Sequence, residues 1–124
     1  MINVKILKRK DLSLGFKIEG HALSSEELRK SGDAYDLICN SLSVLSQSIL
    51  IGITEVLKVE VKYEIHDGFL DINLSDLKED DIEACQVLLL TFEKSLISLV
   101  ESIKLSFGNK KSSEYIRFKK EEVQ

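Results

Sequence analysis

The chain has 124 residues, of which 44% are apolar and 31% charged, and its 17 basic and 21 acidic side chains give a net charge of −4. That length suits a single domain over residues 1–124, which can bury roughly two thirds of the surface of its unfolded form. The acidic balance argues against direct binding of nucleic acid, which usually needs a basic patch. Apolar runs such as 49–53 are too short to cross a bilayer, so we expect no membrane partner.

The N-terminal residues predict a β-hairpin followed by a long loop. Apolar and polar residues nearly alternate over 2–8 and over 12–19, as they do in half-buried strands. Residues 22–35 are mostly polar, charged or small, and we interpret them as a loop that closes over a ligand. A loop of this length inside a compact domain is usually functional or disordered, so we expect it to be the most mobile internal segment.

The middle of the chain predicts a long helix and a second hairpin. Apolar residues recur at spacings of three and four from Ile38 to Val56, which indicates a helix over 36–57 that begins at Asp36. Alternating residues then flank Asp67-Gly68, which is a strong signal for a two-residue hairpin turn.

The last third predicts a second long helix and a closing strand. Apolar residues recur at three and four from Ile82 to Ile103, after an acidic entry that suits the positive end of a helix. A short strand around 115–118 and a frayed tail over 120–124 follow. Two hairpins, this short C-terminal strand and two long helices predict an α+β fold, with one mostly antiparallel sheet and both helices packed on one face.

Two cysteines are candidates for chemistry. We recognise no signal peptide, so Cys39 and Cys85 predict reduced thiols in a cytoplasmic protein. Cys39 is the third residue of a helix capped by Asp36, where unpaired backbone N–H groups and the helix dipole stabilise a thiolate. The alternative is that Cys39 is a small apolar residue at the edge of the core. Cys85 lies inside the apolar stripe of the second helix and is expected in the core.

Two histidines complete the set of candidate groups. His21 follows Gly20 at the end of a predicted strand, where its imidazole could act on Cys39 as general base and acid; a surface role is the alternative. Asp36 could cap the helix, orient His21, or do both. His66 precedes the hairpin turn and is expected to be solvated. The spacings suit neither a zinc site nor a nucleotide loop, so we expect no metal and no cofactor.

Two short motifs carry a family resemblance. Gly20-His21-Ala22, followed by Asp36-Leu37-Ile38-Cys39, resembles the paired motifs of the ribosomal-processing cysteine protease family Prp. The order of predicted strands and helices matches as well, so the resemblance covers nearly the whole chain. It implies a homodimeric α+β cysteine protease that removes the N-terminal extension of large-subunit ribosomal protein L twenty-seven through a thioester. The resemblance also implies that the cut falls after an aromatic residue and before Ala, in an apolar extension similar to Phe-Phe-Ala. This sequence departs from the family in the longer segment between His21 and Cys39 and in Asn40, where the family has Ala.

The resemblance also implies roles for individual residues. Cys39 would be the nucleophile and His21 the general acid/base, with Asp36 in support. Four neighbouring residues would contact the substrate: Gly20, Ala22, Asn40 and Ser41. The backbone N–H groups of Cys39 and Asn40, at the start of the helix, would hold the oxyanion. The alternative is a non-catalytic dimeric module that binds peptides or the ribosome; Cys39→Ser would leave binding intact in either case but abolish cleavage only in an enzyme.

Overall fold

The computed structural model describes residues 1–20 and 33–123, with the side chains of 33–36 excepted. Its strands are β1 (Ile2–Arg9), β2 (Leu12–Glu19), β3 (Lys62–His66), β4 (Phe69–Asn73) and β5 (Ile116–Glu122). Its helices are α2 (Asp33–Ile51), which continues as the π-helix η1 (Gly52–Val56), then α3 (Glu79–Ala84) and α4 (Gln86–Tyr115).

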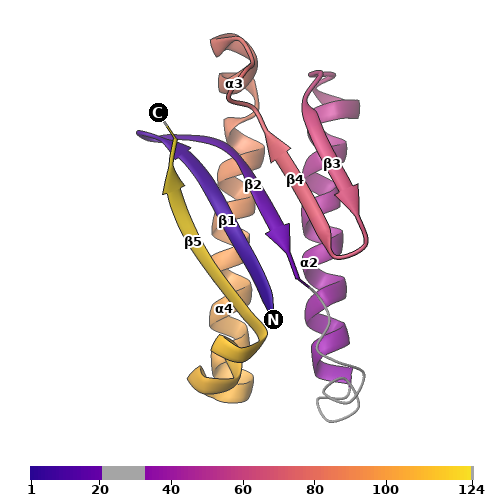
Figure 1. Cartoon of the computed structure of the whole chain (residues 1–124), viewed down its shortest axis with the longest axis vertical. Helices are drawn as coiled ribbons and strands as arrows, with labels where there is room; N and C mark the ends of the chain where they lie inside the picture. Colours follow the sequence, from indigo (N-terminus) through magenta and orange to yellow (C-terminus); the bar gives the residue numbers. More distant parts are fainter. Residues whose placement is uncertain (21–32, 124) are drawn as a thin grey trace.

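The strands form one five-stranded sheet in the order β3-β4-β2-β1-β5. The pairs β1–β2, β2–β4 and β3–β4 are antiparallel, whereas β5 pairs parallel with β1. The long helices α2 and α4 run antiparallel to each other behind this sheet, and they leave its other face open (Figure 1). This arrangement confirms the predicted α+β fold with both long helices on one face.

The core lies between the sheet and these two helices. Alternation along β1, β2 and β4 directs their apolar side chains toward α2 and α4. The following core residues are at most 2% exposed: Val4, Ile6, Leu14, Phe16, Ile53, Ile72, Leu89, Phe92 and Leu96. At the centre, the rings of Phe16 and Phe92 stack with their centroids 3.8 Å apart. Burial of each such side chain contributes roughly 1.5–3 kcal/mol to folding.

A glycine lets the end of α2 approach α4 closely. A Cβ atom at Gly52 would lie 2.8 Å from the Cδ1 atom of Leu88 on α4. The absence of a side chain at this position therefore brings η1 against α4, and Ile53 beside it is fully buried.

The first long helix begins earlier than the sequence predicted. It starts at Asp33, three residues before Asp36, so part of the stretch that we expected as a loop over 22–35 is helical. Asp36 therefore lies inside the helix rather than at its cap. The apolar period begins only at Ile38, and periodicity does not mark a helical turn that precedes it. Residues 21–32, the rest of the expected loop, lie outside the described residues.

The C-terminal third is also divided differently. The predicted second helix is two helices, α3 and α4, which meet at Cys85. The chain of α4 leaves helical geometry at Gly108, where φ is 87°, and becomes helical again up to Tyr115. The expected frayed tail is ordered as far as Val123: β5 runs to Glu122 beside β1, and the Val123 N–H donates to the Lys8 carbonyl at 2.7 Å. Local composition does not report this pairing with the distant N-terminal strand.

The helix over Leu37–Val56 is strongly apolar. It spans 20 residues with a mean hydropathy of 1.6, which is long and apolar enough to cross a membrane, although no single apolar run in the sequence is. Its residues Leu42, Ile49 and Ile53 are buried in the core with the sheet. A helix packed in a protein core can have the same length and apolar composition as a membrane-spanning helix, so these two properties are weak evidence for a membrane span.

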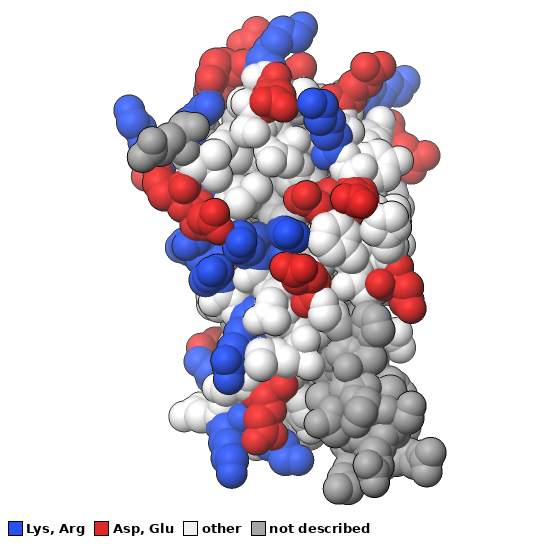
Figure 2. Space-filling model, in the orientation of Figure 1, with Lys and Arg blue, Asp and Glu red and all other residues white. Residues whose placement is uncertain are grey.

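The open face of the sheet is charged, with both signs intermixed (Figure 2). Lys119, Lys5 and Lys17 lie opposite one another across β5, β1 and β2. The carboxylates of Glu121 and Glu19 lie 3.0 Å from Lys5 and 3.7 Å from Lys17. These groups are partly exposed, so each pair contributes little to stability, and the charges keep this face of the sheet hydrated.

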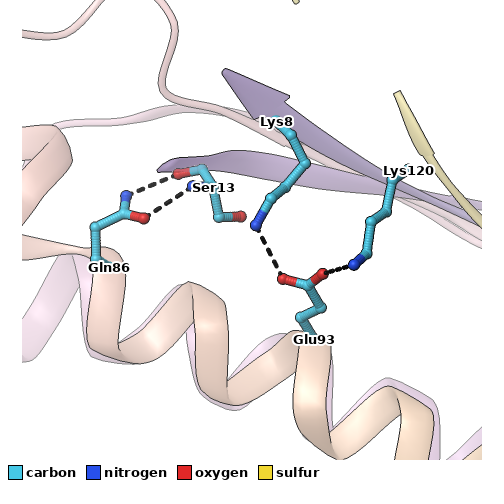
Figure 3. A network of polar contacts seen from close by, with 5 residues as sticks. All are labelled: Lys8, Ser13, Gln86, Glu93 and Lys120. Carbon is cyan, nitrogen blue, oxygen red and sulfur yellow. Dashed lines mark hydrogen bonds and ion pairs between the residues drawn. The ribbon is translucent and has the colours of Figure 1, made fainter. Parts of the chain in front are cut away.

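A buried carboxylate joins α4 to two strands (Figure 3). Glu93 is 4% exposed, and its two carboxylate oxygens lie 3.1 Å from Lys8 Nζ on β1 and 2.9 Å from Lys120 Nζ on β5. Burial by itself would raise the pKa of Glu93, but hydrogen bonds and charge from Lys120 and Lys8 outweigh it, so the pKa lies below the usual value. About two turns earlier on α4, Gln86 pairs with both the N–H and the carbonyl of Ser13.

Replacement of this carboxylate is expected to destabilise the fold. Glu93→Gln should lower the free energy of unfolding by roughly 3 kcal/mol, because the side chain of Lys8 is left largely buried without a counter-charge. Urea denaturation at pH 7 measures this difference. Glu101→Gln, on the exposed side of α4, is the control and should change stability by less than about 0.5 kcal/mol.

The same carboxylate makes stability depend on pH. Its pKa is lower in the folded than in the unfolded chain, so its contribution is complete above the ordinary glutamate pKa of about 4.3. That contribution is lost as the pH falls through the lower folded-state pKa. Wild type should therefore lose more stability than Glu93→Gln between pH 6 and about pH 3; equal losses would contradict the assignment.

Candidate functional site

A cavity of about 260 Å³ opens where α2 faces the β3–β4 hairpin and the ends of β1 and β2. Its apolar floor is formed by Ile2, Ile18, Leu42 and Leu70, all of them buried. Its polar wall is formed by one face of α2, with Cys39, Asn40, Ser43, Ser46 and Gln47. A concave site with an apolar floor and a few polar groups is typical of a site that binds an apolar side chain in a defined orientation.

Cys39 lies in this cavity, half-buried on α2 and packed against the core. Because α2 begins at Asp33, Cys39 is in the second turn, not the third residue of the helix. The backbone N–H groups that lack a helical partner belong to the first four residues, 33–36. The prediction that the N–H groups of Cys39 and Asn40 hold the oxyanion is therefore wrong, since both are used inside the helix. The helix dipole also acts less on Cys39 than predicted, because its effect fades after the first turn.

Gly20 lies at the rim of the same cavity, at the end of β2. Its φ of +92° belongs to the region that favours glycine, and a Cβ atom here would lie 2.3 Å from the carbonyl oxygen of Met1. Its N–H donates to the carbonyl of Gly68 at 3.2 Å, which ties the end of β2 to the turn of the β3–β4 hairpin. Only glycine fits this position, so the end of β2 can lie against Met1 at the rim of the cavity.

The structure brings together some of the residues that the sequence singled out. Cys39, Asn40 and Gly20 line one cavity. Ser41 is exposed and is not part of the cavity lining, and its hydroxyl donates to the Leu37 carbonyl one turn earlier at 2.8 Å. His21 and Ala22 lie outside the described residues, as does the side chain of Asp36.

Three polar residues of the cavity wall were missed from sequence. Ser43, Ser46 and Gln47 follow Cys39 by four, seven and eight positions, so they share its face of α2. The Gln47 amide donates to Ser43 Oγ at 2.8 Å, and the Ser46 hydroxyl donates to the Ser43 carbonyl at 3.1 Å. Helical spacing from Cys39 was a signal that could have found them. The part of the wall from the hairpin, 65–70, carries no such signal, because only the fold places it beside α2.

The other histidine and the other cysteine lie as predicted. His66 is exposed, and its Nε2 atom is 2.7 Å from Glu64 Oε1 on β3. Cys85 is fully buried at the junction of α3 and α4. Burial, and then the charge of Asp81, raise the pKa of the Cys85 thiol, so it stays protonated and inert.

Comparisons with known proteins give one family, from a family model, and one fold, from solved structures. The model of the family described as cysteine protease Prp matches residues 1–107. The structure of SMU.848 from Streptococcus mutans is similar over 99% of this chain and 96% of its own, with 21% identity and a TM-score of 0.72.

Two structures from Staphylococcus aureus share the fold as well. The first is an essential ribosomal processing protease Prp with a covalently linked product peptide, similar over 98% of this chain and 100% of its own, with 21% identity and a TM-score of 0.64. The second is a hypothetical protein with the same coverage, 16% identity and a TM-score of 0.58. No curated protein matches the chain.

The two thiols should differ in reactivity. Iodoacetamide near pH 7 is expected to alkylate Cys39 at least about tenfold faster than Cys85, because Cys39 borders a cavity whereas Cys85 reacts only when the core opens. Mass spectrometry of peptides after timed labelling measures both rates. In urea the two rates should converge, and equal rates in the native protein would contradict the assignment.

Proposed function

The chain belongs to the cysteine protease Prp family, and on that premise we propose that it is an endopeptidase in which Cys39 is the nucleophile and His21 the general acid/base. Asp36, three residues before Cys39, is proposed to support this pair. The observation that carries the proposal is that one cavity is lined by both Cys39 and Gly20, the residue immediately before His21. Gly20, Ala22, Asn40 and Ser41 are proposed to contact the substrate.

The reaction proceeds in two steps. His21 accepts the thiol proton, and the Sγ atom of Cys39 attacks the scissile carbonyl carbon. The C–N bond breaks as His21 returns the proton to the leaving amine, which leaves a thioester on Cys39. His21 then takes a proton from water, whose oxygen attacks the thioester, and the carboxylic acid product leaves as the thiol re-forms. The chemistry needs neither a metal nor a cofactor.

The proposed substrate is a precursor of large-subunit ribosomal protein L twenty-seven, from which the enzyme removes an N-terminal extension. The similar S. aureus protease is named as a ribosomal processing enzyme and carries a product peptide. The apolar floor of the cavity suits the aromatic residue that precedes the cut in substrates of this family. We place the enzyme in the cytoplasm, where reducing conditions keep Cys39 a thiol.

Substitution of the two proposed catalytic residues tests this function. Wild type should cleave a peptide that contains Phe-Phe-Ala, and Cys39→Ser should lower kcat/KM by roughly 10³-fold or more. His21→Ala should lower it as well and should slow alkylation of Cys39, because the thiol pKa rises without the imidazole. Ser102→Ala, on the exposed face of α4, is the control. Cleavage that persists in Cys39→Ser would refute the assignment.

We also propose that two copies form a dimer through α2. Leu37, Val44 and Ile51 are spaced by seven residues and are 68%, 67% and 50% exposed, so they form one apolar stripe on the outer side of the helix. Small side chains flank the stripe at Ser41 and Ser48, which permits close approach of a second helix. An apolar stripe of this kind suits the core of a two-fold interface.

The mass in solution tests the dimer. Wild type should sediment as a dimer at tens of micromolar, and Val44→Glu should sediment as a monomer, because a buried carboxylate would meet its own copy across the two-fold axis. Leu105→Glu is the matched control, since Leu105 is 89% exposed on a different helix. A monomeric wild type would count against the proposal.

A further inference from the structure

The strand β3 forms an open edge of the sheet beside the cavity. It pairs with β4 on one side, and no other strand of the described chain lies on its other side. All five of its residues are exposed. In Figure 1, β3 lies at the edge of the sheet and in front of α2, the helix that carries Cys39.

The register of the hairpin tells which backbone groups of β3 lack a partner in β4. The two-residue turn Asp67-Gly68 is closed by the pair His66↔Phe69, which makes this the hydrogen-bonded pair nearest the turn. Hydrogen-bonded and non-bonded pairs alternate along an antiparallel ladder. The N–H and carbonyl groups of Ile65 and Tyr63 are therefore directed away from β4, toward the open edge.

The side chains of these two residues are apolar and exposed on the helix side of the sheet. Tyr63 and Ile65 lie opposite Ile72 and Leu70, which are buried on that side. They are nevertheless 52% and 44% exposed. Sheet edges are normally protected by charge, proline or a covering segment. An edge that combines unpaired backbone groups with exposed apolar side chains is typical of a site to which an extended peptide adds as a strand.

The edge leads directly into the cavity of Cys39. Ile65 belongs both to the open edge and to the cavity wall, and the turn that follows it continues that wall opposite α2. A strand that pairs with Tyr63 and Ile65 places alternate side chains on the helix side of the sheet. Residues beyond the pairing advance about 3.3 Å each along the strand direction, and the hairpin end of β3 is where the cavity lies. Backbone pairing with the edge and entry of a side chain into the cavity are thus compatible in one extended chain.

We propose that the substrate binds as an additional strand on the open edge of β3, paired with the backbone of Tyr63 and Ile65, so that its apolar side chain enters the cavity at Cys39. This inference rests on the proposed protease function and adds the backbone recognition of the substrate. The affinity for the chain comes mainly from main-chain hydrogen bonds, and the specificity comes from the side chain in the cavity.

Binding to Cys39→Ser tests the proposal without requiring cleavage. The probe is a fluorescein-labelled peptide that contains Phe-Phe-Ala, measured by fluorescence anisotropy. Tyr63→Pro removes one edge N–H and should weaken binding about three- to tenfold more than Tyr63→Ala, which keeps it. Proline is tolerated at a strand edge, and circular dichroism checks the fold. Lys62→Ala is the control, because its side chain projects from the opposite face, pairs with Asp76 outside the cavity lining and should leave binding unchanged when removed.

Methylation of the peptide backbone provides an independent test that leaves the protein intact. N-methyl groups placed one residue at a time should weaken binding at every second position on one side of the scissile bond, because only alternate amides face β3. Uniform tolerance of N-methylation, or equal affinity of Tyr63→Pro and Tyr63→Ala, would overturn the proposal. A changed oligomeric mass of Tyr63→Pro would assign the edge to a second copy and would overturn it as well.

These outcomes separate the docking mode from the chemistry. If wild type cleaves the peptide but the Tyr63 variants do not differ, the docking proposal fails and the protease assignment stands. If the two-residue period of N-methylation is seen while wild type does not cleave the peptide, the docking proposal stands and the proposed activity on this sequence fails.

Discussion

The packing of α2 against the apolar face of the sheet is the constraint on which the rest of the structure depends. Burial of Ile38, Leu42 and Ile49 fixes the rotation of the helix about its own axis. With that rotation, the neighbouring face, which carries Cys39, Ser43 and Gln47, lines the cavity opposite the β3–β4 hairpin. The opposite side, with Val44, is left to solvent or to a partner. One buried stripe thus decides which residues can take part in chemistry and which in association.

The hairpin opposite α2 is held in place by contacts that are far apart in sequence. The N–H of Gly20 bonds to the carbonyl of Gly68, and a side chain at Gly20 would collide with Met1. The end of β2, the start of β1 and the hairpin turn therefore meet at one rim of the cavity. The glycine of the Gly-His-Ala motif therefore has a steric role that is separate from the chemistry proposed for His21.

At the edge of the sheet formed by β5, ion pairs add to the apolar contacts with α4. Glu93 links α4 to β1 and β5 through two lysines, and every buried side-chain polar atom of the described part of the chain has a hydrogen-bond partner. A carboxylate with two cationic partners fixes the position of β5 along β1, because a shift of that strand would leave a buried charge unpaired. The ion pairs thus hold β5 at one edge of the sheet, whereas β3 forms the opposite edge, which stays open in the described chain.

Local pattern determined much of this protein. Alternating residues identified the two hairpins and helical spacing identified both long helices, because each of these follows from side chains close together along the chain. For the same reason Cys85, at the junction of α3 and α4, was placed correctly in the core. The motifs around Gly20 and Cys39 carried the family for the same reason. What only the tertiary structure decided involves residues distant in sequence: the parallel pairing of β5 with β1, the charge cluster at Glu93, and the hairpin wall opposite Cys39. The early start of α2 also escaped prediction, since its first turn contributes little to the apolar stripe. Because the helix begins at Asp33, the N–H groups of Cys39 and Asn40 are paired inside it and are not available to hold an oxyanion.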